Sequence, residues 1–133
     1  MTNAYRLLLV FLLMLLLTSF FSPWSFAYGN GSIAALGWLG ANSMIGEKAI
    51  IALSNMLTVV YVCAYLGMIL YKKWARALLT TTALLGGLSI PLYGMSVQSG
   101  YEAMLGYFAT LGDGMVIALS FFSELRLKFS KAG

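Results

Sequence analysis

The sequence predicts an all-α membrane protein: a four-transmembrane-helix bundle with a short interfacial or re-entrant segment between the first and second helices. Of its 133 residues, 61% are hydrophobic and 9% are charged, and the mean hydropathy is +0.89. An ordinary soluble domain carries about 25% charged residues. The apolar residues form long unbroken runs rather than the ~10-residue alternating segments of a membrane β-barrel. We therefore expect residues 1–133 to form a single integral membrane domain.

Basic residues lie at the ends of the apolar runs and determine the expected topology. With four spans, seven of the eight Lys and Arg residues fall on one side of the membrane, and Lys48 falls on the other. The positive-inside rule places the basic side in the cytoplasm. We therefore expect a multi-pass protein of a bacterial cytoplasmic (inner) membrane with both termini inside.

The first apolar run predicts a transmembrane helix over about residues 7–24, which is just long enough to cross a ~30 Å hydrocarbon core. The same region has a second interpretation. Arg6, the apolar run and the small-x-small pattern at residues 25–27 also fit a cleaved secretory signal peptide. We favour the retained helix because Trp24 and Tyr28 fit an aromatic belt at the membrane surface.

The longest connection follows at about residues 25–48, on the outer side of the membrane. Asn30-Gly31 predicts a turn, after which Ser32 can cap a short helical segment over residues 33–39. This segment is too short to span a bilayer. We expect it to lie in the outer interface or to fold back over the bundle.

Three further apolar runs predict the remaining spans, over about residues 49–71, 77–95 and 104–124. A basic cytoplasmic loop at residues 72–76 joins the second span to the third, and Pro91 predicts a kink or an early end in the third. Residues 96–103 form a polar outer turn. A basic cytoplasmic tail, residues 125–133, follows the fourth span.

A carboxylic acid, Asp113, lies near the middle of the fourth predicted span. A charged side chain at the bilayer centre costs roughly 2.5–3.5 kcal/mol on insertion scales, so the other helices must shelter, pair or protonate it. Counted from the outer ends of the predicted helices, several polar side chains lie at a comparable depth. We therefore expect an intramembrane polar cluster of Asp113, Asn55, Thr58, Ser89 and Tyr93.

Three roles are open for this acid. It can be protonated and hydrogen-bond a neighbouring helix, a contact worth about 0.6 kcal/mol. It can form a proton- or ion-linked site. It can also contact the membrane helix of a partner protein. The apolar runs contain no second charge with which to build a relay, which argues against a self-sufficient pump.

Small residues recur every four positions along the same predicted span, at Gly106, Thr110, Gly114 and Ala118. They form a gently drifting strip on one side of the helix, where another backbone can approach closely. We expect this strip to be a helix-packing face, with Asp113 on or beside it.

The residue types argue against several classes of site. The chain has no His and a single Cys, Cys63. Haem, zinc and iron–sulfur sites therefore lack their usual ligands, and an intramolecular disulfide is impossible. No nucleophile–base pair is evident, and the basic residues form no stripe typical of nucleic-acid binding. We expect no enzymatic activity, no cofactor, no metal and no nucleic-acid partner.

The motifs favour packing over chemistry. We therefore expect an accessory or interaction protein: a small subunit, assembly factor or regulator of a larger membrane complex that binds another membrane protein or itself. The alternative is a small oligomeric proton- or ion-linked transporter or channel that uses Asp113. Anionic lipid headgroups are the other expected partners, at Lys72, Lys73, Arg76, Arg126, Lys128 and Lys131.

Overall fold

The computed structural model describes residues 2–19, 39–41 and 43–131 of the chain. Within these ranges the regular secondary structure is helical apart from one short antiparallel pairing, between β1 (Leu39–Ala41) and β2 (Met95–Ser96). In the described part of the chain, three helices are long and apolar enough to cross a membrane. They are α3 (Glu47–Ile69), α4 (Lys73–Ser89) extended by the 3-10 turn η2 (Ile90–Leu92), and α5 (Gly100–Phe122). A shorter apolar helix, α1 (Thr2–Ser19), precedes them, and α6 (Arg126–Lys131) follows them.

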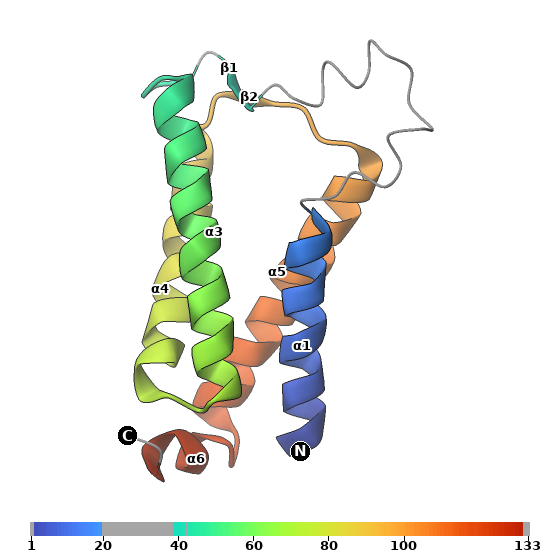
Figure 1. Cartoon of the computed structure of the whole chain (residues 1–133), viewed down its shortest axis with the longest axis vertical. Helices are drawn as coiled ribbons and strands as arrows, with labels where there is room; N and C mark the ends of the chain where they lie inside the picture. The colour runs from blue at the N-terminus through green and yellow to red at the C-terminus, as the bar shows by residue number, and fades with distance from the viewer. Residues whose placement is uncertain (1, 20–38, 42, 132–133) are drawn as a thin grey trace.

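The apolar helices form two antiparallel pairs, α1 with α5 and α3 with α4 (Figure 1). Both termini and the α3–α4 turn lie at one end of the molecule, where the two pairs come together and α6 lies beside them (Figure 1). Toward the other end the pairs diverge. We call the first the basic end and the second the far end.

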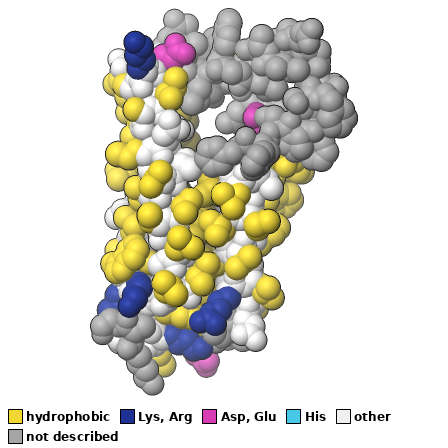
Figure 2. All heavy atoms as spheres, viewed as in Figure 1, with side chains coloured by type: hydrophobic (Ala, Val, Ile, Leu, Met, Phe, Trp, Pro, Cys, Tyr) yellow, Lys and Arg dark blue, Asp and Glu magenta, His cyan; other side chains and the backbone are white. Residues whose placement is uncertain are grey.

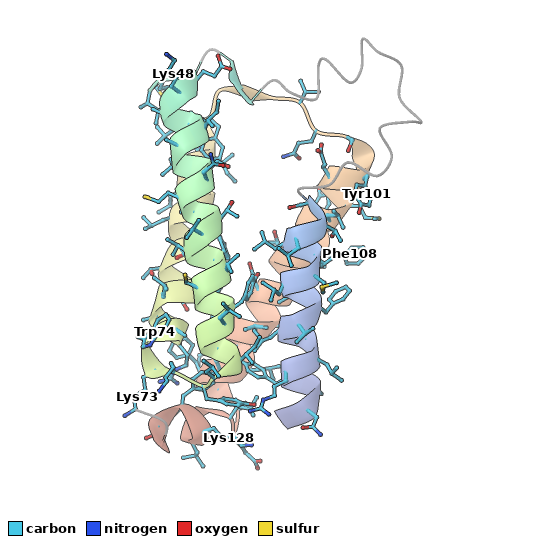
Figure 3. All side chains as sticks on the ribbon, in the orientation of Figure 1. Lys48, Lys73, Trp74, Tyr101, Phe108 and Lys128 are labelled. Carbon is cyan, nitrogen blue, oxygen red and sulfur yellow. The ribbon has the colours of Figure 1, made fainter. Side chains whose placement is uncertain are left out.

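The distribution of charge justifies these names. Figure 2 shows dark-blue Lys and Arg side chains gathered at the end that carries the termini, with apolar side chains along the flanks. Figure 3 places Lys73 and Lys128 at the basic end and Lys48 at the far end. The molecule thus has the charge asymmetry that the sequence predicted.

The core lies in the half of the bundle nearest the basic end. Apart from Ile50, the buried residues of α3 fall between Ala64 and Met68, near its end, whereas those of α4 fall near its beginning. The largest fully buried apolar side chains in this half are Tyr5, Phe129, Leu9, Leu12, Met68, Leu79 and Val116. Every helix therefore contributes to one core at the basic end.

Two glycines let the helices of each pair approach closely. A Cβ atom at Gly112 of α5 would overlap the side chain of Leu12 on α1. A Cβ atom at Gly67 of α3 would lie 2.7 Å from the Cβ of Ala75 and 2.9 Å from Cη2 of Trp74 on α4. Small residues at such crossings strengthen helix packing in lipid.

The turn between α3 and α4 is a Schellman motif. The N–H of Tyr71 donates to the carbonyl of Met68 at 3.1 Å, and the N–H of Lys72 donates to the carbonyl of Gly67 at 2.9 Å. Tyr71 has a φ of 57°, at a position that is usually glycine because a side chain there costs about 1–3 kcal/mol. Its ring is buried, with 7% exposed, so packing offsets the cost.

The helix boundaries correct the predicted ones. The helices begin two to five residues before residues 7, 49, 77 and 104, the expected starts. Residues 73–76, predicted as loop, form the first turn of α4. At α5 the cause is a capping box: the Ser99 hydroxyl accepts from the N–H of Glu102, whose carboxylate accepts from the N–H of Ser99. Hydropathy marks the apolar part of a span, whereas helix caps are polar.

The tail is more ordered than a basic segment after the last span implies. We expect residues 125–133 to form a basic cytoplasmic tail, and the structure shows that Leu125 and Phe129 within it are buried and that α6 is part of the packed structure. Residues 20–38 lie outside the described residues, and with them the end of the first predicted span and most of the expected interfacial segment. Its last residue, Leu39, belongs to β1.

Candidate functional site

Asp113 is sheltered between the two helix pairs. Its Oδ1 accepts a hydrogen bond of 2.5 Å from the hydroxyl of Tyr65 on α3. The Tyr65 side chain is buried, and one turn earlier Tyr61 packs against it, with ring centroids 6.0 Å apart. Because α3 and α5 belong to different pairs, this hydrogen bond joins the pairs in the middle of the bundle.

Asp113 also lines a hollow of about 510 Å³ bounded by α3, α4 and α5. Tyr61 contributes from α3, and most of the remaining lining consists of small residues from the other two helices. On α4 these are Thr80, Ala83, Gly86 and Gly87, and on α5 they are Thr110 and Gly114. Three larger apolar residues, Leu84, Ile90 and Ile117, complete the lining. The hollow therefore combines one carboxylic acid with walls made mostly of small side chains.

These walls are open. Among the described residues, a Cβ atom added at Gly87 or Gly114 would meet no atom within 4 Å, and one at Gly86 would reach only the Tyr61 hydroxyl at 4.0 Å. Leu84, which also lines the hollow, is 62% exposed, and Leu111 of α5 is 66% exposed. A second helix or an apolar ligand can thus approach Asp113 without displacing the chain described here.

The predicted polar cluster does not assemble around Asp113. Ser89 and Tyr93 do come together, with their hydroxyls hydrogen-bonded at 3.1 Å. Thr58 instead donates to the carbonyl of Ser54 within its own helix, at 3.0 Å, and Asn55 is exposed. Of the predicted contacts between these residues, the structure contains the one between Ser89 and Tyr93.

Asp113 is hydrogen-bonded to Tyr65 instead of Asn55. Tyr65 lies nearly three helical turns after Asn55 along α3. The prediction counted depth from the outer end of each helix, which assumes that the helices begin at the same height. Figure 1 shows instead that α5 is tilted and begins closer to the middle of the molecule than α3 does. The tilt brings Asp113 level with the later turns of α3.

The predicted helix-packing strip of α5 is not packed against any other helix among the described residues. Its four residues, Gly106, Thr110, Gly114 and Ala118, are all exposed. The buried face of α5 consists of Leu105, Gly112, Val116 and Ser120, on roughly the opposite side of the helix. Small residues occur on both sides of α5, so spacing alone could not tell which side α1 would take. Two members of the strip face the hollow.

A second polar site lies at the basic end. It includes Arg76, which the sequence predicts to contact anionic lipid headgroups, but its aromatic residues were not predicted. The rings of Tyr5, Tyr71 and Phe129 pack together, with centroids 6.1 Å apart for the two tyrosines and 5.2 Å apart for Tyr71 and Phe129. Arg6 lies 5.2 Å from the centre of the Tyr71 ring, and Arg76 lies 5.1 Å from that of Phe129. We call Tyr5, Tyr71, Phe129, Arg6 and Arg76 the aromatic–cation cluster.

The described part of the chain contains no group of three or more His, Cys, Asp or Glu side chains placed to hold a metal ion.

No family model, curated protein or solved structure matches this chain.

Proposed function

We propose that this protein is a small, non-enzymatic accessory subunit of a bacterial inner-membrane complex. It crosses the cytoplasmic membrane four times with both termini inside, and it binds a transmembrane helix of an unlike protein in the hollow between α4 and α5. The observation that carries this proposal is Asp113 in the wall of an open hollow lined by small residues.

Two features support four crossings. Leu9 and Leu12 of α1 are fully buried, so this helix supplies part of the core, as a retained span does. Its 18 described residues give a rise of about 27 Å, close to the ~30 Å of a hydrocarbon core. The gathering of Lys and Arg at one end (Figure 2) agrees with a cytoplasmic location of that end.

Charge complementarity favours an unlike partner over a second copy of the chain. An acid within the membrane is stabilised by a basic group or a hydrogen-bond donor at the same depth. All eight Lys and Arg residues lie outside the apolar runs, and the chain has no His. A second copy therefore cannot place a cation opposite Asp113, whereas a helix that carries Lys, Arg or His near its middle can.

The walls of the hollow also suit a helix. Gly86 and Gly87 on α4 face Thr110 and Gly114 on α5 across it, and small residues on both sides allow a helix to approach the two backbones closely. In lipid, packing and interhelical hydrogen bonds rather than the hydrophobic effect drive such association. A helix bound in the hollow would therefore pack closely against α4 and α5 and place its own polar residue beside Asp113.

The volume of the hollow favours a second candidate function, a small oligomeric proton- or ion-linked transporter. About 510 Å³ lies within the ~300–1,000 Å³ range of small-molecule sites, and acids within membranes often mark ion paths. In this candidate, several copies line the pathway and Asp113 takes up the proton or cation.

Purification of the tagged protein from its native membrane in mild detergent separates the two candidates. We expect an unlike membrane protein to co-purify in fixed ratio, identified and quantified by mass spectrometry. A homo-oligomer without an unlike chain would overturn the accessory role and favour the transporter.

Three variants sharpen this experiment. Asp113→Asn removes the charge, and Gly114→Leu fills the hollow from a position with no atom within 4 Å. We expect each to reduce the retained partner about tenfold, which corresponds to about 1.4 kcal/mol. Gly106→Leu is the matched control, because Gly106 is equally open but does not line the hollow. Equal retention by all three variants would contradict the proposed docking site.

A further inference from the structure

Three buried hydrogen-bond donors of the aromatic–cation cluster have no partner among the described residues: the hydroxyls of Tyr5 and Tyr71 and Nε of Arg76. The two tyrosines are deeply buried, with 2% and 7% of their surfaces exposed. A buried donor left unpaired loses its bond to water without replacement. The side chains of this cluster therefore offer three buried donors to an acceptor that lies outside the described residues.

The side chains that carry the three donors are each fixed within the aromatic–cation cluster. The rings of Tyr5 and Tyr71 are stacked, with an interplanar angle of 24°. The Arg76 guanidinium is fixed from two sides, by its Nη1 donating to the carbonyl of Ser120 at 3.2 Å and by the Phe129 ring at 5.1 Å. Side chains fixed in this way lose little freedom when they bind a ligand.

Positive charge surrounds the donors. Arg6 and Lys128 both lie over the Tyr71 ring, at 5.2 and 5.7 Å from its centre. Of the four acidic residues in the sequence, Glu124 alone belongs to this end, against seven basic residues. The charge balance therefore selects an anionic acceptor.

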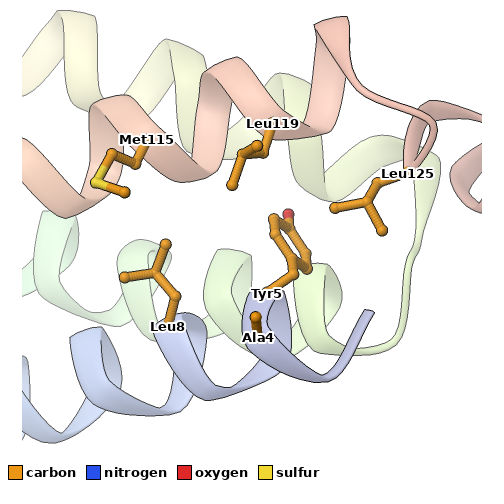
Figure 4. A pocket seen from close by; sticks show the side chains of 6 residues that line it. All are labelled: Ala4, Tyr5, Leu8, Met115, Leu119 and Leu125. Carbon is orange, nitrogen blue, oxygen red and sulfur yellow. The ribbon is translucent and has the colours of Figure 1, made fainter. Parts of the chain in front are cut away.

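An apolar slot of about 260 Å³ adjoins the cluster and shares the ring of Tyr5 with it. It lies between α1, α5 and the start of the tail, and its lining is Ala4, Tyr5, Leu8, Met115, Leu119 and Leu125 (Figure 4). Figure 4 shows the Tyr5 hydroxyl directed toward α5, between Leu119 and Leu125. Tyr5 thus presents its ring to the apolar slot and its hydroxyl to the region between these two leucines.

From this juxtaposition we propose that the basic end binds an anionic phospholipid. Its phosphate accepts hydrogen bonds from Tyr5, Tyr71 and Arg76, and part of one acyl chain occupies the slot. Phosphate offers several acceptor oxygens to such donors, and Arg is well suited to bind it. The proposed cytoplasmic side of the membrane is the side rich in anionic lipids. A free phosphate has no acyl chain to place in the slot, whereas a phospholipid can occupy both the slot and the site of the three donors.

Lipid titration of the purified full-length protein in detergent tests this site, with the midpoint of thermal unfolding as the readout. The ligands are short-chain phosphatidylglycerol, phosphatidylcholine with the same chains, and inorganic phosphate. We expect phosphatidylglycerol to raise the midpoint at concentrations at least tenfold below those that the other two require. Equal potency of the two lipids would overturn the selection of an anion. Equal potency of phosphate and phosphatidylglycerol would overturn the role of the slot.

The double variant Tyr5→Phe/Tyr71→Phe removes both hydroxyls and keeps the stacked rings. We expect it to bind phosphatidylglycerol at least tenfold more weakly, since each hydrogen bond to a charged group contributes about tenfold. Without lipid it should unfold no earlier than the unmodified protein, because it removes unpaired buried groups. Tyr107→Phe, at an exposed tyrosine of α5, is the matched control. Unchanged affinity in the double variant would overturn the proposal.

A third variant addresses the slot alone. Met115 lines the slot but is 56% exposed, so Met115→Trp can fill it without disturbing the core. We expect this variant to lose the advantage of phosphatidylglycerol over inorganic phosphate while its response to phosphate is retained. Retention of the full advantage would contradict an acyl chain in the slot. None of these measurements depends on a partner helix in the hollow beside Asp113.

Discussion

At the basic end, α6 and all the apolar helices share one core, whereas the polar contacts at the far end of the described chain lie mostly within single elements. The core includes the stacked rings of Tyr5, Tyr71 and Phe129. The far end has the capping box of α5, the bond between Ser89 and Tyr93, and the short β1–β2 pairing. Between these two regions the Tyr65–Asp113 bond joins the pairs. The comparison indicates that the described helices are anchored to one another chiefly at the basic end.

The largest expected effect tests the anchoring. Phe129→Ala removes a ring that is 0% exposed, and we expect it to lower the free energy of unfolding by about 3–5 kcal/mol. Phe122, at the end of α5, is 92% exposed, and Phe122→Ala should change the free energy of unfolding by no more than ~0.5 kcal/mol. Denaturant titration in detergent micelles measures both. Similar losses in the two variants would break the comparison, because the tail would then not belong to the core.

An intermediate effect tests how the α1–α5 pair is packed. Gly112→Ala places a Cβ atom against Leu12, and we expect a loss of about 1–3 kcal/mol from overpacking. Gly106→Ala is the control on the same helix. No atom of the described residues lies within 4 Å of a Cβ placed there, so the better helix propensity of Ala should stabilise the protein by up to ~1 kcal/mol. We expect the two variants to change the free energy of unfolding in opposite directions in the same assay. A destabilising Gly106→Ala would show that the exposed strip is packed after all.

The smallest expected effect tests the far end. Ser99→Ala removes the capping-box hydroxyl of α5, which typically contributes about 1 kcal/mol. We expect faster amide hydrogen exchange in the first turn of α5 and unchanged exchange around Val116 in the core. Ser130→Ala, at an exposed residue of α6, should leave both regions unchanged. Faster exchange throughout α5 would mean that the far end is coupled to the core.

The sequence was informative about elements that depend on long apolar runs. The described part of each run is helical over most of its length, because long apolar runs in lipid must satisfy their backbone groups internally. The ends were wrong where polar residues continued a helix, as at Lys73 and Glu102. Hydropathy contains no information about capping, and the capping box at Ser99 and Glu102 would have been the better guide.

The site was predicted less well, because it depends on how helices tilt and turn. The need to shelter Asp113 was evident from its chemistry. Its hydrogen-bond partner, Tyr65, could not be predicted, because that contact depends on the tilt of α5 and residue spacing does not reveal the tilt. The role of the tail did leave a signal. Leu125 and Phe129 are four residues apart with basic residues between and after them, a pattern typical of an amphipathic helix.

The packing of Phe129 against Tyr5, with ring centroids 6.4 Å apart, has a consequence for biosynthesis. This contact joins α1 to α6 across more than 120 residues of sequence. The core at the basic end therefore stays incomplete until nearly all of the described chain has been synthesised.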